Sequence, residues 1–279
     1  MTSAKNKVEQ DVNVPNPPSG KLISCQCTQA QLQSHDFRNW ALKMHEDLGR
    51  MHRKLWEYCF ITQALSERGM LIPGKRGLGF AVGTEPLPAL FASLGCEIIA
   101  TDLDTEEARQ QGWVDTSQHA ASLDSLNDRG ICPPDQFQKR VDFRFVNMRE
   151  IPDDLGTYDF IWSSCSLEHL GSLQLGEEFI YNSLKHLKPG GVSVHTTEYN
   201  VQSNFFTIKE GGSVIYRKRD LKRIAKKLRK QGFKIELDFT EGKMPYDAIV
   251  DEPPYTGNVH LKLRLEGFVA TSFGLIIEN

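Results

Sequence analysis

The fold of this chain is decided by residues 75–104, KRGLGFAVGTEPLPALFASLGCEIIATDLD. The stretch predicts a strand, a glycine-bearing turn at Ala81-Val82-Gly83, a helix, and a second strand that ends in an acid. Such a turn lets a ligand approach the backbone, and the following helix offers N–H groups without intrahelical partners. An acid about 20 residues after the turn, here Asp102, is placed to accept hydrogen bonds from ribose hydroxyls. The unit therefore predicts a site for an adenosine-type ligand.

Three further segments follow in order: the strand-like VDFRFVNMREIP (141–152), then TYDFIWSSCSLEHLGS (157–172), and, after a helical stretch, HLKPGGVSVHTTEYN (186–200). This order resembles the class I S-adenosylmethionine-dependent methyltransferases, from about Gly74 to the C-terminus. The resemblance implies an α/β fold with a Rossmann-like, doubly wound, seven-stranded sheet whose last strand is antiparallel. It also implies N-terminal capping helices and S-adenosyl-L-methionine as the cofactor.

The resemblance assigns roles to single positions. Asp102 falls on the family's ribose-binding acid, and Asn147 falls on the acid that usually meets the adenine amino group. The side-chain oxygen of an asparagine can accept the same hydrogen bond. Residues 158–161 fall on the strand after the adenine site, and residues 187–191 on the turn before strand five. The implied cofactor-binding residues are Phe80, Ala81, Val82, Gly83, Glu85, Asp102, Leu103, Asn147, Met148, Ser164 and Cys165.

The turn departs from the family string in three places. Ala81 and Glu85 replace the first and third glycines, and Gly79 stands where the family has an acid that helps to hold the cofactor's amine. We expect Glu85 either to take over that role or only to favour the helix N-terminus through the helix dipole. A glutamate cannot hold a positive φ without strain, so we expect an ordinary backbone at Glu85 and a side chain aimed at the ligand. Ala81 costs little if its φ is negative.

Candidate catalytic groups follow the predicted fourth and fifth strands, whose ends face the ligand crevice of a doubly wound sheet. Methyl transfer from a sulfonium is an in-line displacement that depends on positioning, and a hydroxyl acceptor also needs a base. We expect His169, Glu198 and His195 to be catalytic. Alternatively, His169 or Glu168 supports its loop and His195 is a hydrogen-bonded core residue. A further hypothesis is a divalent metal held by Glu168, His169, His195 and Glu198.

Bulk properties point to a cytoplasmic enzyme. The net charge is −3 and the sequence pI is about 6.3, so no global basic field favours nucleic acid or an anionic membrane. The six cysteines lack CxxC pairing, as expected of reduced thiols. No apolar run approaches the length of a membrane span, and the first ten residues have no signal-peptide core.

We expect three parts: a flexible tail over residues 1–33, which contain VPNPPSG, a helical cap over residues 34–72, and a methyltransferase domain over residues 73–279. Within the cap, residues 52–56 are a candidate lid, with Arg53 able to meet an acidic group. The segment 112–139 has few apolar residues and is expected to cover the adenosine side.

Residues 217–230 contain nine lysines and arginines, but Leu221, Ile224 and Leu228 predict a core-facing stripe of a helix. We expect the cations on its solvent face, because the stacking aromatic residues of single-strand binders are missing there. Residues 260–279 predict two antiparallel strands with a turn near Glu266-Gly267.

The leading hypothesis is a methyltransferase that acts on a small-molecule acceptor, with a hydroxyl of a sugar or saccharide as the methylated group. Nucleic acid is not an expected partner. Two alternatives stay open: a non-catalytic module that binds S-adenosylmethionine, and an RNA methyltransferase that uses the basic helix 217–230.

Overall fold

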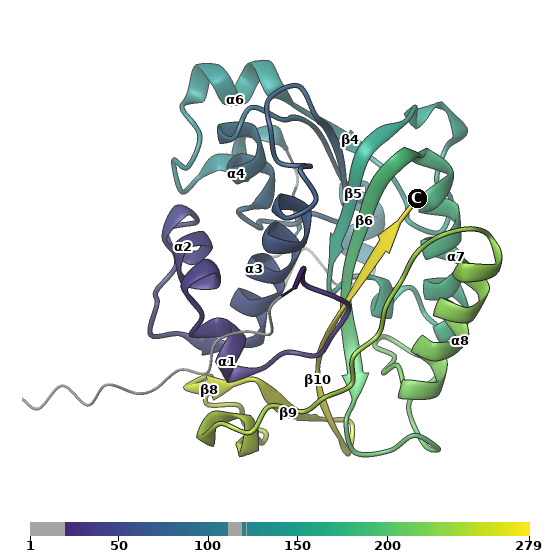
Figure 1. Ribbon diagram of the computed structural model, residues 1–279. Coiled ribbons are helices and arrows are strands. Elements are labelled where there is room, and N and C mark those ends of the chain that lie inside the picture. The colour runs from purple at the N-terminus through teal and green to yellow at the C-terminus, as the bar shows by residue number, and fades with distance from the viewer. Residues whose placement is uncertain (1–19, 111–118, 121) are drawn as a thin grey trace, which may run out of the picture.

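The computed structural model describes residues 20–110, 119–120 and 122–279. Its centre is an eight-stranded sheet with the order β4-β3-β2-β5-β6-β10-β9-β7 (Figure 1). The five strands β4, β3, β2, β5 and β6 are parallel to one another. Strand β10 is antiparallel to both β6 and β9, and β7 is parallel to β9. Their bounds are β2 Arg76–Phe80, β3 Glu97–Asp102, β4 Val141–Phe145, β5 Tyr158–Ser164, β6 Leu187–Asn200, β7 Val250–Asp251, β9 Lys262–Leu265 and β10 Phe268–Glu278.

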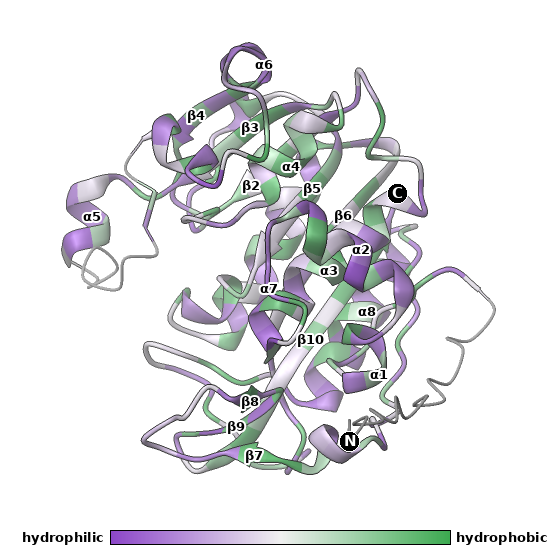
Figure 2. Cartoon of the chain, turned by 90° about the vertical axis from the view of Figure 1, so that its left-hand side faces the viewer, coloured by the Kyte–Doolittle hydropathy of each residue, from purple (hydrophilic) through white to green (hydrophobic). Residues whose placement is uncertain are grey.

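This order confirms the expected doubly wound sheet and its antiparallel last strand. The sheet has eight strands instead of the expected seven, because the two-residue edge strand β7 pairs with β9. A separate two-stranded sheet pairs β1 (Met51–His52) with β8 (Val259–His260). Figure 2 shows β7, β8 and β9 grouped at the lower end of the molecule, with α5 (Thr105–Gln110) standing apart at the left of the view.

Helices cover both faces of the sheet (Figure 1). One face carries α2 (His35–Lys43), α3 (Arg53–Ser66), α4 (Leu87–Ser93) and α6 (Pro134–Arg140), and the other carries α7 (Leu173–Ser183) and α8 (Lys218–Lys230). The shorter helices are α1 (Gln29–Leu32) and the 3-10 turns Leu123–Asn127, Asp153–Leu155, Leu167–His169, Leu184–His186 and Pro245–Ala248.

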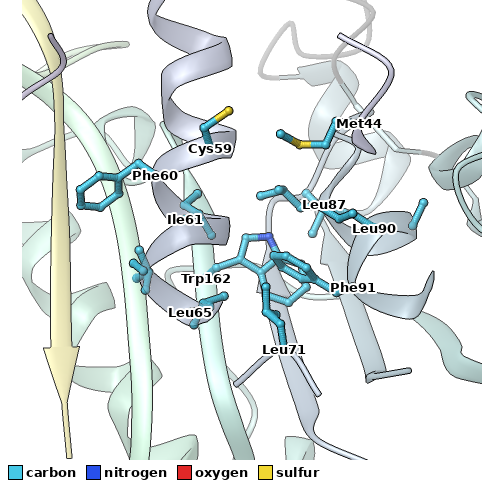
Figure 3. Close-up of a cluster of buried hydrophobic side chains, with 14 of the residues drawn as sticks. Met44, Cys59, Phe60, Ile61, Leu65, Leu71, Leu87, Leu90, Phe91 and Trp162 are labelled. Carbon is cyan, nitrogen blue, oxygen red and sulfur yellow. The ribbon is translucent and has the colours of Figure 1, made fainter. Parts of the chain in front are cut away.

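Strand alternation divides the buried side chains between two cores. Phe160 and Trp162 of β5 point into the first core, beneath α3 and α4, whereas Ile161 points into the second. Figure 3 shows Trp162 surrounded by Leu87, Phe91 and other side chains of the first core. Because both faces of the parallel strands are covered, β2 and β5 are buried along almost their whole length.

The tail expected over residues 1–33 is wrong for its described part, residues 20–33. The N–H of Cys27 donates to the carbonyl oxygen of Ser272 at 2.9 Å, and the N–H of Gly274 donates to that of Cys25 at 2.8 Å. Both cysteines are buried. This segment therefore pairs with β10, a contact that the local sequence did not indicate. Residues 1–19 lie outside the described part.

The helices expected between residues 34 and 72 are present as α2 and α3. However, α3 packs directly on β5, β6 and β10, and its Trp56 and Phe60 are fully buried. It is thus a layer of the first core rather than a separate cap. None of the helices in the described residues has the length and apolar character needed to cross a bilayer.

The predictions for the C-terminal third are confirmed, with one exception. In α8, Leu221, Ile224 and Leu228 are fully buried, and the cationic side chains of the helix lie toward solvent. The exception is Arg217, directly before the helix, which is buried and forms an ion pair with Asp220. The turn between β9 and β10 consists of Glu266 and Gly267, with φ of 48° and 85°.

Candidate active site

A cavity of about 440 Å³ opens where β2, β3, β4 and β5 end. The strand order reverses at β2, which lies between β3 and β5. Ligands of open α/β sheets bind outside the carboxyl ends of the strands at such a reversal. The cavity walls come from the residues that follow these four strands and from the segment that leads into α3.

The expected cofactor-binding residues line this cavity, with one exception. Phe80 is fully buried in the second core, where its ring meets that of Phe179 edge to face at 5.2 Å. The expected contact of Phe80 is wrong because the pleat turns this last residue of β2 away from the cavity. The lining residues among those expected are Ala81, Val82, Gly83, Glu85, Asp102, Leu103, Asn147, Met148, Ser164 and Cys165.

Asp102 fastens the turn to the end of β3. Its Oδ2 accepts from the N–H groups of Gly83 and Ala120, both at 3.0 Å, and its Oδ1 accepts from that of Leu103 at 2.8 Å. Burial raises the pKa of Asp102, and these N–H groups oppose the shift. Ala120 and the cavity-lining His119 belong to the segment 112–139, which was expected to cover the adenosine side and of which residues 112–118 and 121 lie outside the described part.

The turn holds one residue under strain. Ala81 has a φ of 47°, whereas an alanine fits this turn without strain only if its φ is negative. A left-handed backbone at a residue with a Cβ costs about 1–2 kcal/mol, and such outliers cluster at functional sites. The ordinary backbone expected at Glu85 is confirmed, because this residue is not among the described residues with positive φ. Its Oε1 accepts from Nε1 of Trp162 at 2.6 Å.

His169 faces the cavity from the 3-10 turn after β5. Its Nδ1 lies 2.8 Å from the carbonyl oxygen of Gly212. A carbonyl oxygen only accepts, so this contact assigns the ring proton to Nδ1 and the basic lone pair to Nε2. His169 is therefore oriented by the loop that follows β6.

His195 does not line the cavity. It is fully buried, with Ser163 Oγ at 2.8 Å from Nδ1 and Ser193 Oγ at 2.7 Å from Nε2. Burial lowers its pKa to about 3. The catalytic role expected for His195 is contradicted, because serine hydroxyls engage both ring nitrogens away from the cavity. The alternative of a hydrogen-bonded core histidine describes it.

Glu168 and Glu198 also lie behind the cavity wall. Glu198 is 3% exposed and forms an ion pair with Arg53, the acidic contact that the sequence suggested for this arginine. Glu168 is fully buried and accepts from Thr197 Oγ1 at 3.2 Å. Burial raises the pKa of Glu168. The charge of Glu198 also raises this pKa, whereas His169 lowers it. A direct catalytic contact for Glu198 is therefore contradicted by its place behind the wall.

The metal hypothesis fails on geometry. Within the described residues, no three or more His, Cys, Asp or Glu side chains converge in a way that could hold a metal ion. His195 lies between two serines and Glu198 is paired with an arginine, and of the four candidate ligands the cavity lining includes His169.

Sequence reasoning missed part of the cavity wall, namely Arg50, which directly precedes β1, Tyr58 of α3, and Arg149 of the loop after β4. His52 and Lys54, which belong to the candidate lid, line the cavity as well. The Nζ of Lys54 lies 2.8 Å from Oε2 of the fully buried Glu57. The i, i+4 spacing of Lys54 and Tyr58, which places both on one helix face, was the available signal.

No family model matches the chain, and no curated protein matches it. Among solved structures, it is similar to an S-adenosylmethionine-dependent methyltransferase from Mesorhizobium loti, at 12% identity, a TM-score of 0.48, and coverage of 78% of this chain and 97% of that one. It is also similar to magnesium protoporphyrin IX methyltransferase from Synechocystis with bound SAH, at 12% identity, a TM-score of 0.46, and coverage of 87% of this chain and 94% of that one. The [4+2]-cyclase SpnF is similar at 20% identity, a TM-score of 0.46, and coverage of 76% of each chain. By the strand order of its own sheet, this chain has the Rossmann-like α/β fold that the sequence resemblance implies.

Proposed function

We propose that this chain is an S-adenosylmethionine-dependent methyltransferase that acts on a hydroxyl of a small molecule, with a sugar or saccharide as the acceptor class. One observation carries the proposal. A single cavity at the strand-order reversal collects the strained turn, Asp102, Asn147 and His169 from four separate segments. These residues stand at the positions that the sequence resemblance assigns to the cofactor and the base.

In this proposal the adenosine end of the cofactor lies against the ends of β3 and β4. Asp102 offers carboxylate oxygens to the ribose hydroxyls. Asn147 accepts from the N–H of Arg149 through Oδ1 at 2.9 Å, and its Nδ2 donates to Glu107 at 3.2 Å. A carbonyl-type oxygen has two lone pairs, so Oδ1 of Asn147 can accept an adenine amino group as well.

The bound cofactor supplies a methyl group on a sulfonium, ready for in-line displacement. The chain's part is to orient the acceptor, exclude water and take its proton. We assign the proton transfer to Nε2 of His169, which the Gly212 contact leaves with the lone pair. Ser164 and Cys165 at the end of β5 border the same space. Cys165 has a φ of 45°, a second strained position at this edge.

A cytoplasmic location is part of the proposal. All six cysteines are free thiols and five of them are buried, which suits a reducing compartment. Burial raises the pKa of Cys25 to about 12, so its thiol stays protonated and inert.

Isothermal titration with S-adenosylmethionine tests the cofactor, and release of S-adenosylhomocysteine in the presence of hydroxylated acceptors tests the activity. We expect binding together with turnover on at least one such acceptor, and turnover without any metal supplement. Binding without turnover on any acceptor would favour the non-catalytic module. Absence of binding would refute both readings.

One observation favours the RNA alternative. Phe205 and Phe206, 73% and 76% exposed, lie beside the start of α8, where Asn204 accepts from the N–H of Arg219 at 2.8 Å. The basic helix itself has no stacking aromatic residues, but Phe205 and Phe206 of the preceding loop supply two exposed aromatic side chains next to it. Single-stranded nucleic acid binds to such combinations of cations and aromatic faces.

The salt dependence of RNA affinity can distinguish an RNA acceptor from a small-molecule acceptor. In α8, Arg223 and Lys227 pair with Glu177, whereas Lys222 and Lys226 are exposed. An RNA methyltransferase would bind RNA with an affinity that falls steeply with salt, and Lys222→Ala with Lys226→Ala would flatten the slope by about one unit per lost phosphate contact. Arg223→Ala is the matched control. A flat salt dependence in the unmodified protein would exclude RNA as the acceptor.

A further inference from the structure

Gly79, Trp162 and Glu85 together differ from the family pattern at the place where the family has an acid near the cofactor's amine. Gly79 occupies the position of the acid that helps to hold the cofactor's amine. Here no side chain fits there, because a Cβ added at Gly79 would lie 2.3 Å from Cζ2 and 2.7 Å from Cε2 of Trp162. The indole of Trp162 is fully buried and packs edge to face against Phe91 at 5.1 Å (Figure 3). Trp162 therefore closes the usual position of the acid.

The same indole holds a carboxyl group next to this position. Nε1 of Trp162 is bonded to Cε2, which lies 2.7 Å from the added Cβ, and it donates to Oε1 of Glu85 at 2.6 Å. Glu85 is 5% exposed and lines the cavity. A carboxyl group is thus retained next to the closed position, but it enters from the far side of the turn. The alternative that Glu85 acts only through the helix dipole is weakened, because α4 has only seven residues and Glu85 precedes its N-cap, Pro86.

We propose that Glu85 recognises the ammonium group of the cofactor and releases a proton to solvent when the cofactor binds. The step is balanced: the neutral carboxyl loses its proton, and the resulting carboxylate pairs with the ammonium. This inference rests on the proposed function, since it requires S-adenosylmethionine in this cavity.

The charges around Glu85 support a neutral carboxyl in the ligand-free protein. Burial raises the pKa of Glu85 to about 8, the Trp162 bond and Lys54 lower it, and Asp102 and Glu57 raise it. The phenol of Tyr58 also faces Glu85 from α3. The charged residues Asp128 and Arg129 line a small neighbouring cavity that shares Glu85. A cation at this carboxyl favours its ionised form, so cofactor and proton compete.

The test is isothermal titration near neutral pH in buffers of different ionisation enthalpy, which counts the protons released on binding. We expect the unmodified protein to release about one proton more than Glu85→Gln, since the ligand's own titration is common to both proteins. The difference should appear with S-adenosylmethionine and with S-adenosylhomocysteine, because both carry the ammonium. Above the pKa of Glu85, the variant should bind both ligands about tenfold to a hundredfold more weakly.

Glu97→Gln is the matched control, since Glu97 is 63% exposed and starts β3, whereas the cavity lies where this strand ends. A second readout does not depend on the folding of a variant. The indole emission of the ligand-free protein should titrate with a midpoint near the pKa of Glu85, and bound S-adenosylhomocysteine should lower that midpoint. Equal proton release in the unmodified protein and Glu85→Gln would overturn the inference. A difference confined to S-adenosylmethionine would move the contact to the sulfonium and overturn the ammonium assignment. If neither ligand binds the unmodified protein, the proposed function fails instead.

Discussion

Replacement of Asp102 separates ligand binding from the stability of the turn. The carboxylate of Asp102 accepts three backbone N–H groups, from Gly83, Leu103 and Ala120. In the proposed complex it also accepts ribose hydroxyls. Asp102→Ala removes both sets of bonds, whereas Asp102→Asn keeps one acceptor oxygen and loses the charge.

The magnitudes follow from the two sets. A lost hydrogen bond to a charged group weakens cofactor binding by about 1.5–3 kcal/mol, or about tenfold to a hundredfold in Kd. Each buried N–H group left without an acceptor costs about 1–3 kcal/mol of folding free energy. Because the cavity admits water, we take the lower figure for each of the three, and we expect a loss of about 3 kcal/mol for Asp102→Ala and less for Asp102→Asn.

Titration calorimetry measures the first effect and urea denaturation the second. Asp104→Ala is the matched control, because Asp104 lies two residues away on the exposed surface, where its side chain accepts from the N–H of Glu106 at 2.9 Å. Unchanged cofactor affinity in a folded Asp102→Ala protein would mean that the ribose lies elsewhere. Unchanged unfolding free energy would refute the claim that Asp102 anchors the turn.

Three other changes test neighbouring parts of the site. His169→Ala should lower turnover by about a hundredfold to ten-thousandfold with little change in cofactor affinity; a folded variant with full turnover would refute its role as the base. Glu198→Gln should cost about 3–5 kcal/mol of unfolding free energy, because it leaves the buried charge of Arg53 without its partner, and unchanged urea denaturation would contradict this. The unfolded chain protonates His195 below its ordinary pKa, whereas the folded protein does so only near 3, so the free energy of unfolding should fall as the pH drops through that interval. His195→Gln should lessen this acid sensitivity in urea titrations at several pH values, while His35→Gln on the surface should leave it unchanged.

Local sequence patterns were sufficient for the elements that organise the cavity. The glycine-bearing turn, the helix after it, and the acid that ends β3 each follow from short-range rules of periodicity and turn chemistry. The stripe of Leu221, Ile224 and Leu228 also identified α8 and its buried face. These predictions succeeded because the relevant partners lie within one element or one strand–turn–helix unit.

The failures share a different cause, which is contact between distant parts of the chain. Alternation along β6 could not distinguish a histidine fixed between two serines from one that faces a ligand, because Ser163 lies on another strand. The φ of Ala81 depends on the tethering of the turn, where the N–H of Val82 donates to the carbonyl oxygen of Thr101 at 3.0 Å. Pairing of residues 24–27 with β10 joins segments that no local pattern connects.

That last pairing has a consequence for how the protein is made. β10 follows every other strand in sequence but lies between β6 and β9, and the N–H of Ile276 donates to Ser24 Oγ across 252 positions. Contacts of such high sequence separation slow folding, since loop closure must precede any gain from them. During synthesis, β6 and residues 24–27 therefore keep open hydrogen-bonding edges until β10 has left the ribosome. Chaperone demand should be greatest in that interval.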